Sequence, residues 1–376
     1  MAKLTPVFIP MQGDCRELLA QQFDDNSIDA GITDPPYGIG FMGKKWDTFK
    51  PGIETQRIVE ARKSTNPNVI GRKRSPASSP SAVEYDRTLG GQREFQVWTE
   101  SWAREMLRVL KPGAHLVVFG APRSHHRMMC GLEDAGFEIR DTLMWLFGQG
   151  FPKSKNLGGG IGTALKPAWE PIALARKPLG KLTATKAMEV YGTGGLAIDV
   201  CRVGTELVTS RRGLKNSRDG YVGIPDKTNE GRWPANLLLD TEAATLLGAE
   251  SRFFYCPKVS TKEREFGCEH LPVRTPGEMT GGRKVGSAGL NNPRAGAGRG
   301  LGAHNAHPTV KPIALMRWLV QLVTPPSGIV VDPFVGSGST AIAAILEGHR
   351  CFGFDLEEEW LDVSEARVNA WKRRGG

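Results

Sequence analysis

The sequence predicts an α/β fold whose core is a largely parallel β-sheet. Short apolar runs alternate with helical stretches at both ends of the chain; residues 7–10 and 28–32, for example, flank a helical stretch at 16–22. This alternation is typical of parallel sheets that carry helices on their faces. With 376 residues, of which 40% are apolar, the chain can bury one large core and still carry an elaborate insertion.

The elements of the first half follow from periodicity and turn residues. A helix is expected at residues 94–110, where apolar side chains recur on one side. These side chains are Trp98, Trp102, Met106 and Val109. The Lys-Pro-Gly segment that follows is expected to end this helix. The next expected elements are a strand at 115–119, a helix at 125–135, and strands at 138–147 and 170–176.

The α/β alternation returns near the end of the chain, after an irregular middle. The expected elements there are a helix at 313–323, a strand at 328–331, a helix at 340–347, a strand at 351–354 and a helix at 358–371. Residues 177–304 show patchy periodicity and frequent glycine, with ordered patches only at 233–239 and 253–255. The glycine-rich tract at 281–302 cannot form a packed core by itself.

A second irregular segment, residues 38–93, interrupts the first half. It is rich in Gly, Pro, Ser, Lys and Arg. Such a composition cannot bury enough apolar surface to fold alone, so residues 50–93 are expected to be a mobile basic loop that orders on binding.

Composition narrows the class of protein. The formal charge of +9 and the pI of about 9.3 fit a polyanionic partner. No stretch is long and apolar enough to cross a bilayer, and residues 1–10 lack the apolar core of a secretory signal, so a cytoplasmic location is expected. The six cysteines include no CxxC pair, which disfavours a disulfide framework. Cys256, Cys268 and His270 lack paired-ligand spacing, and no metal site is expected.

The first informative motif, DPPYG, follows the strand expected at 28–32. An exocyclic amine of a nucleobase is a poor nucleophile, because its lone pair is delocalised into the ring. Hydrogen-bond acceptors at the amine protons localise that pair, and the Asp34 carboxylate and the Pro35 carbonyl can be those acceptors. Pro35 and Pro36 stiffen the turn, and Tyr37 offers a face for a flipped base, worth roughly 1–3 kcal/mol per base. A Pro-Pro turn after a strand also occurs without catalysis.

The second informative motif, DPFVGSGST, follows the strand expected at 328–331. Gly336 and Gly338 would let the backbone come close to a ligand, and the amides from Ser339 onward, at a helix start, can donate to a carboxylate. Asp332 and Phe334 would flank that ligand. A nicotinamide or flavin site normally reads GxGxxG, and this turn does not.

Two further segments add polar groups to the second motif. Thr309 and Lys311, in HPTVKP, stand just before the helix expected beside the glycine turn, where a hydroxyl and an ammonium could hold the ligand's carboxylate. Asp355 ends the strand in CFGFDL, well placed to accept hydrogen bonds from ribose hydroxyls. A plain helix N-terminus with proline in its first turn also accounts for HPTVKP.

In this order, DPPYG, HPTVKP, DPFVGSGST and GFD closely resemble the motifs of the β-group amino DNA methyltransferases, including phage and prophage site-specific members. The resemblance implies a Rossmann-like, S-adenosylmethionine-dependent methyltransferase fold with circularly permuted motif order, base flipping and direct methyl transfer. It implies that Asp14, beside Cys15, meets the cofactor adenine and that Asp355 binds its ribose. Residues 1–176 would then be the catalytic half, 177–304 an irregular inserted target-recognition region, and 305–376 the cofactor-binding half.

Several reactions share this chemistry. The resemblance favours N6 of adenine, because N4-cytosine enzymes usually have serine in place of Asp34. A carbon-5 cytosine methyltransferase needs a cysteine nucleophile, normally in a Pro-Cys pair, and none occurs here. RNA or protein amine methylation, and an inactive DNA-binding protein with the same fold, stay open.

The expected partner is double-stranded DNA. Lysine and arginine in residues 177–304 and 50–93 would neutralise phosphates, and arginine could read guanine edges. The candidate contacts are Arg72, Lys73, Arg74, Arg211, Arg212, Lys215 and Arg218. Each could equally be a solvated loop charge. The sequence leaves open the recognition site, a homodimer and a partner restriction nuclease.

Overall fold

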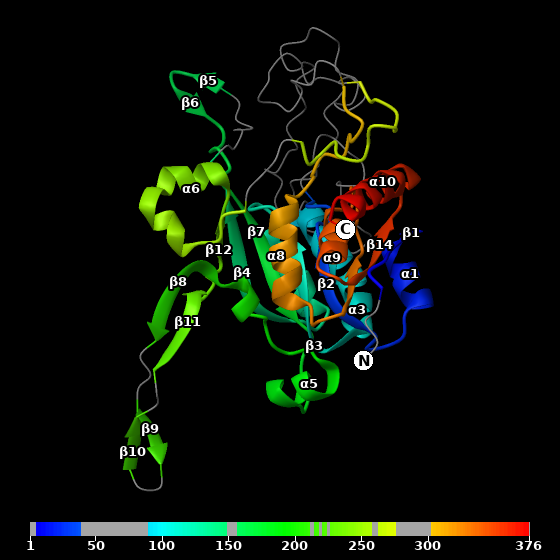
Figure 1. The fold of residues 1–376 in the computed structure, drawn as a ribbon. Coiled ribbons are helices and arrows are strands. Elements are labelled where there is room, and N and C mark those ends of the chain that lie inside the picture. Colours follow the sequence, from blue (N-terminus) through cyan, green and yellow to red (C-terminus); the bar gives the residue numbers. More distant parts are fainter. Residues whose placement is uncertain are drawn as a thin grey trace, which may run out of the picture.

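The computed structural model describes residues 5–38, 89–148, 156–210, 214–217, 220–223, 226–257, 262–275 and 302–375. Within these residues, the central feature is an eight-stranded sheet covered by helices on both faces (Figure 1). In spatial order its strands are β1 (Phe8–Gln12), β14 (Arg350–Asp355), β13 (Ile329–Asp332), β2 (Ile28–Thr33), β3 (Leu110–Phe119), β7 (Trp169–Arg176), β4 (Glu138–Leu146) and β12 (Leu237–Leu239). β7 runs antiparallel to both of its neighbours, and every other pair in the sheet is parallel.

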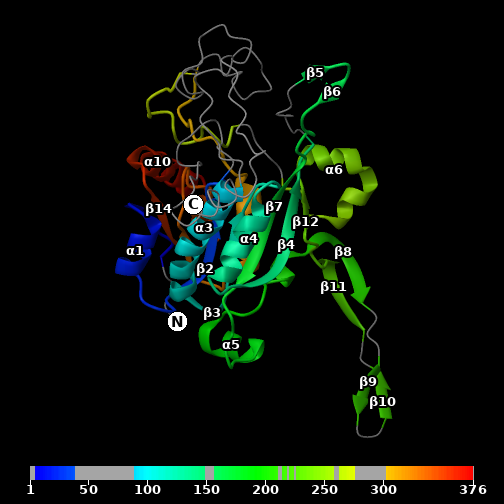
Figure 2. The ribbon, with the colours of Figure 1, turned by 180° about the vertical axis from the view of Figure 1, so that it is seen from behind.

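Two hydrophobic clusters lie on the two faces of this sheet. One packs under α8 (Ile313–Val323), α9 (Ser339–Leu346) and α10 (Glu358–Gly375), and the other under α1 (Cys15–Gln22), α3 (Leu89–Val109) and α4 (His125–Asp134), as Figure 2 shows from behind. Along β3, Val117 points to the first cluster and Leu116 and Val118 to the second. Successive strand residues face opposite sides, and each fully buried side chain stabilises the fold by roughly 1.5–3 kcal/mol.

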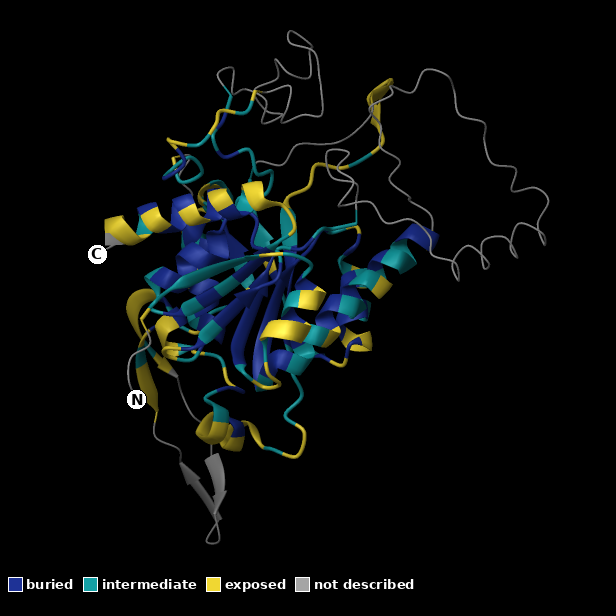
Figure 3. Ribbon diagram, turned by 90° about the vertical axis from the view of Figure 1, so that its right-hand side faces the viewer, coloured by how far each residue is buried: buried dark blue, intermediate teal, exposed yellow. Residues whose placement is uncertain are grey.

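The burial pattern follows from these two clusters. Figure 3 shows the strands buried between helices whose outward sides are exposed. In α3, the expected apolar side is confirmed for Trp102, Met106 and Val109, which are fully buried, while Trp98 is partly buried against the same cluster. The helices that were predicted at 16–22, 125–135 and 313–323 are also confirmed, the last with its predicted bounds.

Two elements begin five residues before their predicted starts. α3 begins at Leu89, so residues 89–93 are helical instead of part of a loop, and residues 39–88 lie outside the described residues. β3 begins at Leu110 instead of His115. Its pairing with β2 is irregular there, with Ile28 opposite Leu110 and Ala30 opposite His115. Gly113 takes a φ of +81°, which lets the Lys-Pro-Gly segment continue as a distorted strand.

The middle region carries more regular structure than its composition suggests. It includes α5 (Ala184–Tyr191), α6 (Thr241–Leu247), a ribbon of β8 (Val203–Ser210) with β11 (Lys227–Arg232), and an outer pair of β9 (Leu214–Ser217) with β10 (Gly220–Gly223). The ordered patch expected at 233–239 is confirmed by β12, which pairs with β4. Because β12 extends the central sheet, the middle region is continuous with the core.

The β5–β6 hairpin and the β8–β11 ribbon point in opposite directions. β5 (Asn156–Gly158) and β6 (Ile161–Gly162) connect the carboxyl end of β4 to the start of β7. The β8–β11 ribbon precedes β12 in the chain, and both views show it pointing away from β5–β6 (Figures 1 and 2). No helix among the described residues is long and apolar enough to span a membrane.

Candidate active site

Four aspartates lie in a row along one edge of the sheet. Asp14 follows β1, Asp355 ends β14, Asp332 ends β13 and Asp34 follows β2. These four strands are neighbours and all run parallel. Parallel neighbours end at the same edge, which is where open α/β sheets bind ligands. The two sequence motifs therefore share one edge, although they lie far apart in the chain.

A direct hydrogen bond joins the two motifs. The Thr33 hydroxyl at the end of β2 donates to Asp332 Oδ1 over 2.6 Å, and the Thr340 hydroxyl lies 3.5 Å from the Ile32 carbonyl. Asp332 is 2% exposed and also accepts from the Phe334 amide. Burial raises the pKa of Asp332 to about 6, against the lowering effect of these hydrogen bonds. The two motifs therefore adjoin, while a contact between Asp332 and the cofactor stays a prediction.

Side chains from two other segments, one at the start of α4 and one just before α8, hold the catalytic motif. The Tyr37 hydroxyl donates to Asp34 Oδ1 over 2.5 Å, and the Ser124 hydroxyl, at the start of α4, donates to the Tyr37 carbonyl over 2.5 Å. Lys311 Nζ lies 2.9 Å from Asp34 Oδ2 and 3.1 Å from Glu170 Oε2, and it donates to the Tyr37 hydroxyl. Pro35 is buried and Pro36 partly exposed, so the turn is packed as well as stiff.

Lys311 takes a different place from the predicted one. It was expected to hold a carboxylate of the cofactor, but its ammonium lies between Asp34 and Glu170, 4.8 Å from the centre of the Phe119 ring. Burial tends to lower the pKa of Lys311, and the two carboxylates outweigh this and raise it. Lys311 is 6% exposed, so this ion-pair cluster lies within the protein. A lysine just before α8 can reach the carboxyl ends of both β2 and β3.

Glu170 was not assigned a role from the sequence. It enters the site because β7 is antiparallel, so the start of β7 lies at the same edge as the ends of β3 and β4. Glu170 pairs in register with Trp145, a partly buried residue of the neighbouring strand. Burial raises the pKa of Glu170, and Lys311 opposes that rise. Only the direction of β7, which periodicity does not reveal, could have indicated this placement.

Hydrogen bonds to the end of β14 hold the glycine turn. The Val335 amide donates to the Phe354 carbonyl, and the Gly336 amide donates to Asp355 Oδ2 over 3.1 Å. Gly336 and Gly338 have φ values of +47° and +78°, which glycine adopts without strain. A Cβ on Gly336 would lie 2.5 Å from the His307 ring, and one on Gly338 would lie 2.8 Å from Ser364. Protein atoms therefore fill the side on which a Cβ would point, and the close approach of a ligand to this backbone stays a prediction.

A buried arginine supports the turn from behind. Arg367 of α10 donates to the Ser337 carbonyl over 2.5 Å and lies 3.4 Å from the Ser339 hydroxyl. Its side chain also donates to the Glu263 carbonyl. Arg367 is fully buried, and burial lowers its pKa to about 10. Sequence reasoning missed this residue, because an arginine on an amphipathic C-terminal helix usually faces solvent.

The remaining predicted cofactor residues line the same edge. Burial raises the pKa of Asp355 to about 6, and its carboxylate also accepts from the Glu357 amide over 3.0 Å. The Phe334 ring centre lies 5.4 Å from the ring centres of both Trp98 and Trp102. The Thr309 amide is 3.4 Å from His307 Nδ1.

Asp14 and Cys15 stand at the start of α1. Asp14 caps the helix by accepting from the Arg16 amide over 2.9 Å, and the Arg16 side chain lowers the pKa of Asp14. Cys15 is 7% exposed and packs in the core, and burial raises its pKa to about 12. Cys15 therefore packs in the core, and its predicted contact with the cofactor stays a prediction.

The edge fits a nucleoside with an amino-acid tail. The buried carboxylate of Asp332 and the partly exposed carboxylate of Asp355 can accept from hydroxyl and ammonium groups, and Phe334 offers a partly buried aromatic ring. Asp355 would face the ribose, as predicted from its position at the strand end. Asp34 and Tyr37 stand one strand further along the edge, where a substrate amine would meet the other end of this ligand.

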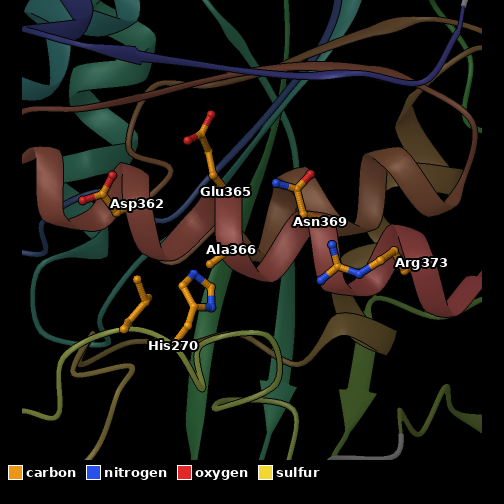
Figure 4. Close-up of a pocket in the computed structure, with 7 residues that line it drawn as sticks. His270, Asp362, Glu365, Ala366, Asn369 and Arg373 are labelled. Carbon is orange, nitrogen blue, oxygen red and sulfur yellow. The ribbon is translucent and has the colours of Figure 1, made fainter.

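A separate cleft of about 390 Å³ runs along α10 (Figure 4). It is lined by His270, Leu271, Asp362, Glu365, Ala366, Asn369 and Arg373. None of these residues belongs to either motif. Among the described residues, no group of three or more His, Cys, Asp or Glu side chains could hold a metal ion, and all six cysteines are free.

The predicted DNA contacts fall mostly outside the described residues. This applies to Arg72, Lys73, Arg74, Arg211, Arg212 and Arg218. Lys215 lies in β9, at the tip of the ribbon that points away from β5–β6 and thus from the motif edge (Figure 1). Its contact with DNA stays a prediction.

Comparison with known proteins decides the family. Residues 28–366 match the DNA methylase family N6_N4_Mtase. The chain belongs to this family. The Type II methyltransferase M.HindIII of Haemophilus influenzae is 25% identical to this DNA methylase over 368 residues, which are 94% of this chain and 92% of that protein. The putative methylase YubD of Escherichia coli is 42% identical over 67 residues, which are 18% of this chain and 30% of that protein.

Among solved structures, the PvuII DNA methyltransferase, described as cytosine-N4-specific, shares the fold of this DNA methylase. It is 15% identical with a TM-score of 0.50, and the match covers 99% of this chain and 93% of that chain. The predicted Rossmann-like methyltransferase fold and the β-group resemblance are therefore confirmed. The protein is an S-adenosylmethionine-dependent DNA methyltransferase of the N6/N4 amino type.

Proposed function

We propose that this DNA methyltransferase transfers its methyl group to N6 of adenine at a specific site in double-stranded DNA. The proposal rests on one observation: the hydrogen-bond acceptor for the target amine is an aspartate. This residue, Asp34, follows β2 at the edge of the sheet and is hydrogen-bonded to Tyr37. A carboxylate accepts an amine proton more strongly than a neutral hydroxyl does, which suits the weakly nucleophilic amine of adenine.

The catalytic steps on this chain follow from the geometry. S-adenosylmethionine, when bound, supplies the methyl group as an electrophilic sulfonium. Asp34 accepts a hydrogen bond from the target amine and localises its lone pair, and the stiff Pro35–Pro36 turn keeps the acceptor in place. Tyr37 gives the flipped base an aromatic face. Asp355, Asp332 and Phe334 are proposed to hold the cofactor, with Arg367 supporting the turn.

Cytosine N4 is the second candidate. The PvuII enzyme, which shares the fold, is described as cytosine-N4-specific. Its low identity gives no information about the base that the present chain methylates. The Asp34 carboxylate could accept a hydrogen bond from either amine, so the methylated product must be identified directly.

The test is the chemical identity of the product. DNA is incubated with the purified enzyme and the cofactor, digested to nucleosides and analysed by mass spectrometry, and its modified positions are then mapped by sequencing. The proposal expects N6-methyladenine at one short recurring sequence. N4-methylcytosine as the product would refute the choice of base, and methyl transfer only to RNA or protein would refute the substrate class.

Target recognition is proposed to lie in residues 177–304. Lys215 is the predicted DNA contact whose backbone is described there, at the end of the ribbon. Replacing a phosphate-binding lysine lowers affinity uniformly across sequences and reduces the salt dependence of binding. We therefore expect Lys215→Ala to lower the salt slope of DNA affinity by about one. An unchanged slope would remove Lys215 from the interface.

A further inference from the structure

The catalytic aspartate is an end member of a row of three charged side chains, of which the middle one is buried and the other two are partly buried. Lys311 Nζ lies 2.9 Å from Asp34 Oδ2 and 3.1 Å from Glu170 Oε2. The side chains of Lys311, Asp34 and Glu170 are 6%, 15% and 25% exposed. The three come from separate elements: the segment before α8, the loop after β2 and the start of β7. We call them the charge triad.

Both carboxylate oxygens of Asp34 are held in place, one by Tyr37 and the other by Lys311 of the charge triad. Tyr37 donates to Oδ1 and Lys311 lies against Oδ2. Each carboxylate oxygen has two acceptor positions, so one on each oxygen stays available for an incoming amine proton. Lys311 also donates to the Tyr37 hydroxyl, so its ammonium contacts both functional side chains of the motif. The aromatic rings of Tyr37 and Phe119 lie 5.6 and 4.8 Å from Nζ and limit its movement.

The charge balance of the triad also suits the reaction. Two carboxylates and one ammonium sum to a single negative charge. Two neighbouring carboxylates without the ammonium could not both ionise, because like charges in a shared buried site favour a proton on one of them. Among the described residues, Asp332 and His307 also interact electrostatically with the triad: burial and Asp34 raise the pKa of Asp332, and burial and nearby cations, Lys311 among them, lower the pKa of His307 to about 3.

We propose that Lys311, anchored by Glu170, is a positioning residue that holds the Asp34 carboxylate correctly oriented for the target amine. The inference rests on the proposed function only in that a nucleobase amine is the substrate. As nitrogen bonds the methyl carbon, the carbon–sulfur bond breaks with its electron pair on sulfur. The amine proton passes to Asp34, which becomes neutral, and Lys311 and Glu170 stay behind as a neutral pair.

The test is a double-mutant cycle on the full-length enzyme with its DNA substrate, read as single-turnover rate against pH. Lys311→Met is expected to slow methyl transfer by at least about 100-fold at pH 7. The acidic limb, where the rate falls as the pH is lowered, is expected to move to higher pH by about one unit or more, because Asp34 and Glu170 then share a proton. Lys311→Met with Glu170→Gln is expected to recover about tenfold of that loss, because the competing carboxylate is gone.

The alternative assignment, in which Lys311 binds the cofactor carboxylate, gives a different result. Lys311→Met would then weaken S-adenosylmethionine binding, measured by calorimetry, leave the pH limb in place and gain nothing from Glu170→Gln. Either an unmoved limb or a double variant no faster than Lys311→Met overturns the proposal. If Lys311→Met does not fold, Lys311→Arg is used instead, because it keeps the positive charge. The acidic limb of Lys311→Arg is expected at the wild-type pH, and a limb moved to another pH would also overturn the proposal.

A matched control is available at the other end of β2, the strand that precedes Asp34. Lys111 Nζ pairs with the buried Asp29 of β2 over 2.5 Å, at the amino end of the strand that leads to Asp34. Lys111→Met removes a comparable ion pair, and its pH profile is expected to match that of the wild type. The wild-type product shows which base is methylated, while the ratio of variant to wild-type rates reports on the triad. N4-methylcytosine as product would therefore refute the proposed base and leave this test intact.

Discussion

The hydrogen bond between Thr33 and Asp332 is the direct link between the two motifs, and Thr33→Val tests it with little change of shape. Asp332 has a pKa raised to about 6, against about 3.9 in an unfolded chain. Between these two pH values the folded state keeps a proton that the unfolded state has lost, so stability falls as the pH rises through this window. Above it the charged, buried carboxylate depends on its donors, Thr33 among them.

The expected loss therefore depends on pH. At pH 8, Thr33→Val removes a bond to a charged group and should lower the free energy of unfolding by about 1.5–3 kcal/mol. At pH 4 the carboxyl is largely protonated, the bond is between neutral groups, and the loss should be about 1 kcal/mol. The assay is denaturant unfolding at both pH values, with the slopes compared to check that the transition itself is unchanged.

A control with the same substitution is Thr99→Val. Thr99 is fully buried in α3, and its hydroxyl donates to the neutral Phe95 carbonyl over 2.8 Å. The loss from Thr99→Val should be about the same at both pH values. If Thr33→Val costs equally at pH 4 and pH 8, or if its pH dependence equals that of Thr99→Val, the carboxylate of Asp332 does not depend on Thr33 and the reasoning is refuted.

Three further predictions concern the cofactor and base sites. Asp355→Asn should weaken S-adenosylmethionine binding by about 10- to 100-fold in calorimetry, since hydrogen bonds to charged groups contribute about 1.5–3 kcal/mol; unchanged affinity would exclude Asp355 from the site. Arg367→Met should lower the melting temperature and the cofactor affinity together, because Ser337 loses its buried donor; a lower melting temperature with intact affinity would limit Arg367 to a structural role. Tyr37→Ala should slow single-turnover methylation much more than Tyr37→Phe, because stacking needs the ring; equal losses would assign the effect to the hydroxyl on Asp34.

The sequence allowed the edge of the sheet to be predicted well. Both motifs follow strands that were expected from apolar runs, and parallel strands in one sheet must end at a common edge, so Asp34 and Asp332 could be placed together before any coordinates. The helix over Ile313–Val323 was likewise predictable, because most of its residues are apolar and Pro312 precedes it.

The sequence could not show which side chains meet across that edge. Glu170 joins the site only because β7 runs antiparallel, and Lys311 lies on Asp34 only because α8 begins beside β2 and β3. The glycines illustrate the same limit: a positive φ was predictable, but the His307 and Ser364 side chains that fill the space beside Gly336 and Gly338 come from other segments. Local patterns predict conformation, whereas these contacts depend on strand direction and packing.

The most direct test of the central claim, that one edge joins the cofactor to a target amine held by Asp34, is to measure cofactor affinity and single-turnover methyl transfer together for Asp34→Ala. The account predicts that S-adenosylmethionine affinity stays within about threefold of the wild-type value, while methyl transfer falls by at least about 1,000-fold, a loss of about 4 kcal/mol of transition-state stabilisation. Near wild-type transfer by Asp34→Ala, or an equal loss of cofactor binding, would contradict it.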